Sequence, residues 1–391
     1  MKPAHRNIAL LAAAQSVLLA NGITLIAINS LLGLQLAPDR RLATLPVTTY
    51  VIGGALSTFA AAFFMKRFGR RAGFMLGGSF ALVASLLGAL AVVQANFWLL
   101  CFATVLAGVY NAFGQQYRFA AADSVELDLK AKAISLTLAG GIVGGVLGPE
   151  LSKFSHNWLT PPFLASYLVL AVLAILSILI TSRLTIPPLT VAEQSEGGRP
   201  LREIFKQPDV IVAISAAVCG FATMNLLMTA TPLAMDFCGF AFNDTAFILQ
   251  WHVIGMFAPS FFTGDLIKRF GVRTILISGA LLMFACAGIA LSGVTLMHFW
   301  WALVLLGIGW NFLFIGGTTL LSASCAPSER AKVQGSNDFM VLGTQALTSL
   351  GAGVMIMGAG WHSLIFFALP MVGLTALVTL LFWQRRVTSA N

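Results

Sequence analysis

The sequence predicts an all-α polytopic membrane protein with twelve transmembrane helices in two pseudo-symmetric six-helix bundles, and three observations support this. Hydrophobic residues make up 58% of the 391 residues and charged residues only 9%, whereas soluble domains carry about 25% charged residues. Twelve apolar runs each approach the roughly 20 residues that a helix needs to cross a bilayer. The basic turn Lys66–Gly69 also recurs as Lys268–Gly271, 202 residues later.

The repeated turn indicates an internal duplication. The same offset of 202 residues aligns Val51–Gly53 with Val253–Gly255 and Phe97–Trp98 with Phe299–Trp300. Duplicated halves of membrane transporters pack around a central substrate site. We therefore expect an N-terminal six-helix bundle over residues 1–186, a cytoplasmic linker over 187–207 and a C-terminal six-helix bundle over 208–391.

Each half divides into six apolar runs. The first run continues to about Leu36, too long for the ~7–15-residue core of a signal peptide, so we count it as a span. The predicted spans are 8–34, 43–65, 73–93, 97–121, 132–152 and 163–183 in the first half, and 209–235, 244–267, 272–293, 297–321, 332–357 and 361–383 in the second.

Lysine and arginine positions predict the orientation of the spans. All but three of the 23 lie at the N-terminus, at the even-numbered junctions including the linker, or at the C-terminus; the exceptions are Arg40, Arg41 and Lys153. We therefore expect both termini on the cytoplasmic side of a bacterial inner membrane. The concentration of basic residues on one side of the membrane accounts for the net charge of +9. We therefore expect the protein to interact with the lipid bilayer and not with nucleic acid.

The sequence has no motif typical of a catalytic site or a metal site. The five cysteines have no CxxC or Cys/His spacing, and they are expected to be small apolar helix residues. The chain also contains no glycine-rich phosphate loop and no nucleophile–base set. We therefore expect no enzyme activity, no cofactor, no metal and no ATP-driven pump. The driving force for transport would then be an ion gradient or the concentration gradient of the substrate itself.

Twelve spans in two repeats, with a basic glycine-containing turn after the second and eighth spans, resemble the major facilitator superfamily over the whole chain. Its loop signature, G-x-L-a-D-r-x-G-r-r, differs here at the acidic position, which is Lys66 in one copy and Lys268 in the other. The resemblance implies a secondary transporter with gating loops at both turns. The matching residues are Arg67, Gly69, Arg70 and Arg71, then Gly264, Leu266, Arg269, Gly271 and Arg273.

Two signatures of the exporter branches of this superfamily are partly present. Gly144, Gly148 and Pro149 match a G-x-x-x-G-P in span five, and Gly140 extends the four-residue spacing. Such spacing lets another helix approach closely, either as structural packing or as a seam along which two halves slide. In span four, Tyr110 occupies the position of the branch's arginine, which is associated with proton coupling.

In this superfamily spans 1, 4, 7 and 10 line the substrate cavity. Tyr110–Asn111 and Trp310–Asn311 lie 200 residues apart, at equivalent places in the two repeats. An aromatic ring beside an amide offers stacking with donor and acceptor groups, which suits a neutral or zwitterionic organic molecule. Hydrogen bonding between helices is the alternative. The candidate cavity residues are Asn21, Tyr110, Asn111, Gln115, Asn225, Thr229, Trp310 and Asn311.

Ionisable residues inside spans are functional candidates because they are costly there. His252 and Asp338 are the candidates for proton coupling, and a hydrogen-bonded packing histidine is the alternative for His252. Arg118, at the cytoplasmic end of span four, either reaches water or takes part in gating or substrate binding.

The two basic turns are expected to gate the cytoplasmic side. We expect Asp338 to pair with a cation of the first turn, and an acid near the end of span four to pair with a cation of the second. The expected partners of Asp338 are Lys66, Arg67 or Arg71. The second set combines Lys268, Arg269 or Arg273 with Asp123, Glu126 or Asp128.

The function that these features favour is secondary active transport of a small organic molecule by a monomer that alternates access between its halves. Proton-coupled export is the leading expectation, and an uncoupled facilitator or an importer of a metabolite is the alternative. A non-transporting receptor or scaffold is the alternative from another class. Such a protein would be expected to lose the paired polar residues of the cavity, and this chain retains them.

Overall fold

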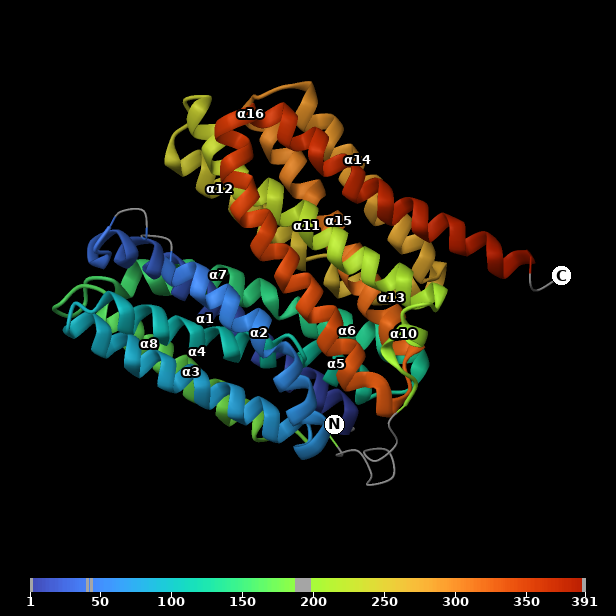
Figure 1. Ribbon diagram of the computed structural model, residues 1–391, viewed down its shortest axis with the longest axis horizontal. Coiled ribbons are helices and arrows are strands. Elements are labelled where there is room, and N and C mark those ends of the chain that lie inside the picture. Colours follow the sequence, from blue (N-terminus) through green and yellow to red (C-terminus); the bar gives the residue numbers. More distant parts are fainter. Residues whose placement is uncertain (1–2, 40–41, 43–44, 187–197, 389–391) are drawn as a thin grey trace. The chain divides into compact units, whose positions relative to one another are not determined.

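A computed structural model describes residues 3–39, 42, 45–186 and 198–388, and all of its regular elements in these ranges are helices (Figure 1). Eleven of the helices are long and apolar enough to cross a membrane, and Phe247–Phe257 is a shorter apolar helix. The predicted all-α membrane class is thereby confirmed. Of the predicted linker, residues 187–197 lie outside the described ranges.

The first compact unit comprises Met1–Ser124, Gly140–Gly197 and Pro327–Leu342. Within it, α2 packs on α4, α3 lies against α4 and α8, and α1 packs on α7 and α8; Figure 1 shows α3 and α8 side by side. Its helices are α1 (Pro3–Leu36), α2 (Leu45–Phe68), α3 (Arg70–Val93), α4 (Phe97–Gly114), α5 (Tyr117–Asp123), α7 (Gly141–Ser155) and α8 (Leu164–Thr181).

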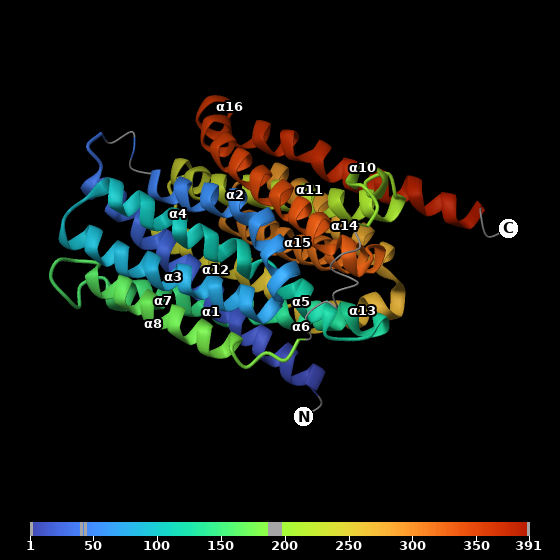
Figure 2. The same cartoon turned by 60° about the horizontal axis from the view of Figure 1, so that its bottom comes forward.

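The second unit comprises Val125–Ala139, Gly198–Ala326 and Gly343–Asn391. Helix α15 is its centre and packs against α11, α12 and α14, and α13 packs on α6 (Figure 2). Its helices are α6 (Lys130–Ala139), α10 (Leu201–Ile204), α11 (Pro208–Phe237), α12 (Phe242–Phe257), α13 (Ser260–Phe270), α14 (Val272–Ser292) and α15 (Leu296–Ser324). The last helix, α16 (Arg330–Thr388), contains both final spans, separated by Gly360 with φ +77°.

These units differ from the predicted halves at two segments. Residues 125–139, the start of span five, belong to the second unit, and residues 327–342, the start of span eleven, belong to the first. At each segment, a glycine allows close packing against a helix of the same unit. A Cβ on Gly264 of α13 would lie 2.6 Å from Cα of Lys132 in α6, and a Cβ on Gly335 of α16 would lie 3.2 Å from Cδ1 of Phe59 in α2.

Three predicted spans are interrupted rather than continuous. Span four breaks at Gln115–Gln116, span five at Gly140, and span eight at Ala258–Pro259. Proline explains the last break because it has no backbone N–H to donate. At the first break, the N–H of Gln116 bonds to the carbonyl of Phe113, three residues back, so the helix tightens for one turn and the two glutamines point to different neighbours.

The repeated basic turns need their glycines for backbone conformation. Gly69 has φ +87° and Gly271 has φ +83°, values that favour glycine because it has no Cβ. A Cβ on Gly271 would meet no atom within 4 Å. The positive φ therefore explains the glycine in both copies of the turn, and at Gly271 space is not the reason.

The glycines of span five serve packing within the first unit. A Cβ would lie 2.1 Å from the carbonyl oxygen of Ala12 if placed on Gly140, 2.4 Å from that of Ser16 if placed on Gly144, and 2.8 Å from Cβ of Ile23 if placed on Gly148. Helices α1 and α7 thus approach at backbone distance, which favours the packing interpretation of this motif.

We expect Gly144→Ala to lower the free energy of unfolding by about 1–3 kcal/mol, because the added methyl group has to push α1 and α7 apart. The matched control is Gly288→Ala in α14, where a Cβ would meet nothing within 4 Å. Chemical unfolding in detergent measures both. A Gly144→Ala variant as stable as the control would contradict the tight packing of α1 on α7.

Candidate functional site

A buried ion pair lies in the first unit. The guanidinium of Arg118, in α5, donates through Nη2 to Oδ1 of Asp338, in α16, and the two side chains are only 2% and 1% exposed. The break before α5 positions Arg118 to face inward. Removing two charges from water is costly, so such a pair persists only with close geometry and further hydrogen bonds.

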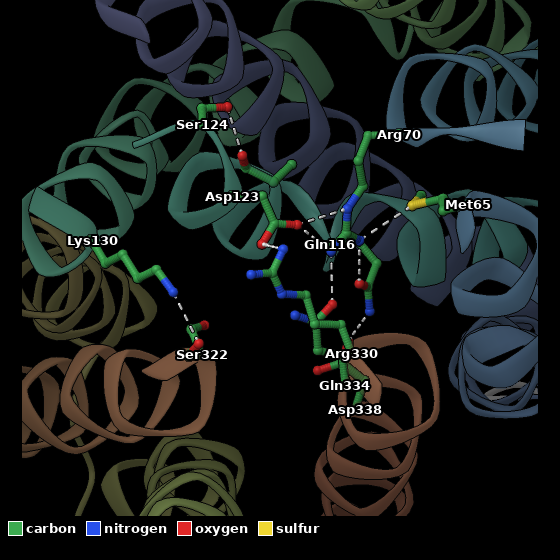
Figure 3. A network of polar contacts seen from close by, with 11 residues as sticks. Met65, Arg70, Gln116, Asp123, Ser124, Lys130, Ser322, Arg330, Gln334 and Asp338 are labelled. Atoms are coloured by element: carbon green, nitrogen blue, oxygen red, sulfur yellow. Dashed lines mark hydrogen bonds and ion pairs between the residues drawn. The ribbon is translucent and has the colours of Figure 1, made fainter. Parts of the chain in front are cut away.

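Further hydrogen bonds come from a polar network that reaches Asp338 (Figure 3). Gln116 Nε2 donates to Asp338 Oδ2 at 2.6 Å, and Gln116 Oε1 accepts from Arg70 Nη1 at 2.8 Å. Arg70 also donates to Asp123 at 2.9 Å and to Gln334 at 2.8 Å. Arg330 completes the network through an ion pair of 3.0 Å with Asp123.

The expected partners of Asp338 were therefore wrong. Arg118 takes the place proposed for Lys66, Arg67 or Arg71. Helix α2 ends at Phe68 and leaves Arg67 exposed beside the Phe68 ring, with its guanidinium carbon 5.3 Å from the ring centroid. Of the first turn, Arg70 is the residue that reaches the network.

The second basic turn makes weaker contacts. Lys268 lies 3.7 Å from Asp128, one of the expected pairings, and both side chains are 60% exposed, so the pair contributes little stability. Arg273 instead pairs with Asp209 at 2.7 Å. Arg269 lies over the ring of Phe270 at 5.1 Å, in the same relation as in the first turn.

Two amides of span four connect to the buried ion pair. Gln115 Oε1 accepts from Arg118 Nη1 at 2.9 Å, and Gln115 Nε2 donates to Asn111 Oδ1 at 3.3 Å. Both amides are only half-buried. The hydrogen-bonded chain Asn111–Gln115–Arg118–Asp338 therefore runs from partly accessible amides to a fully buried carboxylate.

The other candidate cavity residues of the first unit are used in packing. Tyr110 is 2% exposed and donates to Ser177 Oγ of α8 at 3.0 Å. Asn21 is 3% exposed and lies 3.4 Å from the carbonyl of Leu170. These contacts agree with helix–helix hydrogen bonding, the alternative stated for such residues.

Asn311, in the second unit, is also a packing residue. Its Nδ2 donates to the carbonyl of Met256 and to Ser260 Oγ, each at 2.6 Å, and its Oδ1 accepts from Thr263 Oγ1 at 2.7 Å. The side chain is fully buried. Asn311 therefore uses both amide donors and one acceptor site at the break between α12 and α13, which agrees with the helix-packing alternative; its place in the cavity stays a prediction.

Trp310 lies in an aromatic cluster of the second unit. Its ring stacks on Phe314 at 4.9 Å and meets Phe221 and Phe257 edge-on at 5.1 Å and 5.8 Å. The side chain is 3% exposed, and its indole N–H has no hydrogen-bond partner among the described residues. The cluster joins α11, α12 and α15.

The remaining candidates of the second unit divide between packing and partial exposure. Asn225 donates to the carbonyl of Gln345 and to Thr348 Oγ1, each at 3.0 Å, which links α11 to α16. Thr229, one turn later, is half-buried. His252 is fully buried, and its Nδ1 lies 2.8 Å from the carbonyl of Leu303, which matches the packing alternative.

Sequence reasoning missed Gln116, Gln334 and Arg330. Gln116 and Gln334 are 0% and 2% exposed, and both lie beside charged side chains. Adjacent glutamines at 115 and 116 inside an otherwise apolar span were the available signal. The described residues include no group of three or more His, Cys, Asp or Glu side chains that could hold a metal ion.

The sequence model described as Major Facilitator Superfamily matches residues 10–341 and 239–391. The chain belongs to this superfamily. The riboflavin transporter RfnT of Brucella anthropi is 41% identical over 374 residues, which cover 95% of this chain and 94% of that protein. YdeG of Bacillus subtilis, an uncharacterized transporter of the same type, is 27% identical over 94% of this chain and 88% of its own length.

Solved transporters share the fold at low identity. The human organic anion transporter MFSD10 superposes with a TM-score of 0.80 at 12% identity, over 97% of this chain and 100% of that one. The E. coli fucose:proton symporter FucP gives 0.77 at 16%, over 98% and 99%. The chain is thus an integral membrane transporter of a small molecule, and its family and relatives are transporters rather than enzymes.

Proposed function

We propose that this superfamily member transports riboflavin or a closely related flavin. The observation that carries the proposal is the 41% identity to the riboflavin transporter RfnT along 95% of the chain. The residues at hand suit such a molecule. A flavin combines a planar aromatic ring system, which aromatic side chains can stack on, with an imide edge that amides can hydrogen-bond.

The driving force and direction follow from the sequence expectations. We propose an ion or substrate gradient as the drive, because the sequence has no phosphate-binding loop. Proton-coupled export by a monomer remains the leading expectation, with His252 and Asp338 as the candidate titrating groups, and uptake or uncoupled diffusion of the flavin is the alternative.

Flux of radiolabelled riboflavin into and out of proteoliposomes tests this proposal. We expect flux well above that of protein-free vesicles. Acceleration by a pH gradient, abolished by a protonophore, would indicate proton coupling, and flux that ignores the protonophore would indicate a facilitator. Binding of riboflavin without any flux would favour a receptor. Neither binding nor flux would contradict the proposal.

We further propose that both termini face the cytoplasm of a bacterial inner membrane, because nearly all Lys and Arg lie at the corresponding ends of the predicted spans. A reporter enzyme that requires the cytoplasm is expected to be active when fused after Asn391, and one that requires the periplasm is expected to be inactive there. A second fusion, in the loop near Arg40 and Arg41, serves as the opposite control. Activity of a periplasmic reporter at Asn391 would overturn the orientation.

A further inference from the structure

The half-buried amides of Asn111 and Gln115 have hydrogen-bonding capacity that the described residues do not use. Among the described residues, Asn111 Nδ2 donates to no acceptor, and Gln115 Nε2 makes one long hydrogen bond of 3.3 Å to Asn111 Oδ1. A bond of that length is weak and is easily exchanged. Together the two side chains therefore present a donor, an acceptor and a second donor in a row.

A glycine and a leucine side chain border these amides. A Cβ on Gly54 of α2 would lie 3.6 Å from Asn111 Nδ2, 3.7 Å from Cδ1 of Leu342 and 3.4 Å from the carbonyl oxygen of Gly108. These are ordinary van der Waals distances, so an alanine at position 54 would fit with its methyl group in contact with the Asn111 amide. The amide pair thus has one small residue and one apolar residue as neighbours, and all of these residues belong to the first unit.

The same amides are linked to the ion pair. Gln115 Oε1 accepts from Arg118 Nη1 at 2.9 Å, and Arg118 Nη2 donates to Asp338. Asp338 and Leu342 both lie on the segment 327–342, which belongs to the first unit although the rest of α16 belongs to the second. A ligand that moves the Gln115 side chain would therefore change the orientation of Arg118 and one of the contacts that hold this segment, beside those of Asp338, Gln334 and Arg330 with other side chains.

We propose that Asn111 and Gln115 form a donor–acceptor–donor site for the cyclic imide edge of the ligand, and that Gln115 transmits occupancy of this site to the Arg118–Asp338 ion pair. An imide presents a carbonyl, an N–H and a second carbonyl, the complementary order. Asn111 Nδ2 donates to one carbonyl, Asn111 Oδ1 accepts from the imide N–H, and Gln115 Nε2 donates to the other carbonyl. This inference rests on the proposed transport of a flavin.

Riboflavin and 3-methylriboflavin test the recognition step, because the methyl group replaces the imide N–H and leaves both flanking carbonyls in place. Binding to the purified full-length protein is measured by quenching of flavin fluorescence. We expect the parent to bind riboflavin about tenfold more tightly than the methylated analogue, the effect of one hydrogen bond. Asn111→Ala and Gln115→Glu should each weaken riboflavin binding, and Asn111→Ala should bind both flavins equally.

Two further variants keep the test independent of misfolding. Gly54→Ala places a methyl group in contact with Asn111 Nδ2, where the ligand carbonyl would approach, and is expected to weaken riboflavin binding about tenfold with an unchanged unfolding midpoint. Gln94→Ala removes an exposed amide at the end of α3 and should change neither value. If Asn111→Ala retains the parent's full discrimination, this inference is overturned while flavin transport stands. A parent that binds no riboflavin overturns the proposed function and this inference with it.

Hydrogen–deuterium exchange tests the transmission step. Saturating riboflavin should raise deuterium uptake in residues 327–342 of the parent, because the Arg118–Asp338 contact loosens. The variant Gln115→Met cannot accept a hydrogen bond from Arg118. In this variant, deuterium uptake in residues 327–342 should be the same with and without saturating riboflavin. Equal ligand-induced uptake in the parent and in Gln115→Met would exclude Gln115 as the link.

Discussion

Arg118→Met should lower the free energy of unfolding by about 3–5 kcal/mol, because it leaves the buried carboxylate of Asp338 without its charged partner. Both side chains are almost completely inaccessible, so water cannot replace the lost guanidinium. Asp338→Leu is expected to have a similar cost, since it isolates the Arg118 charge. Unfolding by denaturant in detergent, followed by tryptophan fluorescence, measures both variants.

The double variant Arg118→Met/Asp338→Leu separates stability from function. Replacing a buried ion pair by apolar residues of similar volume is often neutral, so we expect most of the lost stability to return. We expect riboflavin transport to be lost in the double variant as in both single variants, because the ion pair could no longer form and break during the transport cycle. A double variant that transports normally would show that the ion pair is only structural.

The fold could be predicted from sequence because membrane spans leave a strong signal in hydropathy and length. The interruptions could not. Gln115, Gln116 and Gly140 are each compatible with a continuous helix, and the breaks there depend on tertiary contacts such as Gln116 to Asp338. Pro259 was the visible exception, since proline restricts the preceding residue and removes a donor.

The buried acid could be found from sequence, whereas its partner could not. Asp338 is conspicuous as a charge within an apolar run. Arg118 lies 220 residues away, and the pairing depends on residues 327–342 belonging to the first unit. Sequence position suggested the loop cations Lys66 and Arg67 instead, because no local pattern reveals that the start of span eleven packs apart from the rest of its helix.

The repeat itself misled the interpretation of Asn311. The two asparagines are 200 residues apart, whereas the contacts of α4 and α15 correspond at an offset of 199 residues. A Cβ on Gly108 would meet Tyr50 and Gly54, and a Cβ on Gly307 would meet the matching His252 and Met256. Asn311 thus corresponds to Ala112 rather than to Asn111. The side chain of Asn311 makes three short hydrogen bonds, while that of Asn111 makes one long one.

This asymmetry predicts opposite effects for two substitutions that look equivalent. Asn311→Ala should lower the free energy of unfolding by about 2 kcal/mol, because it removes the amide that bonds the buried hydroxyl of Ser260 and the carbonyl of Met256; the hydroxyl of Thr263 keeps the carbonyl of Pro259. Asn111→Ala should change stability by less than about 0.5 kcal/mol, since the half-buried amide makes one long hydrogen bond. Its effect should instead be on riboflavin affinity.

Both variants are measured for denaturant unfolding and for riboflavin binding in the same detergent. Asn311→Ala is expected to bind riboflavin with the parent's affinity under conditions in which it is fully folded, because its amide faces the break between α12 and α13 and not a ligand. Asn311→Asp serves as the size-matched variant, since it keeps the acceptor for Thr263 and loses the two donors to Met256 and Ser260. If Asn311→Ala lost affinity while its stability stayed unchanged, Asn311 would belong to the binding site after all, and the distinction between the two repeats would fail.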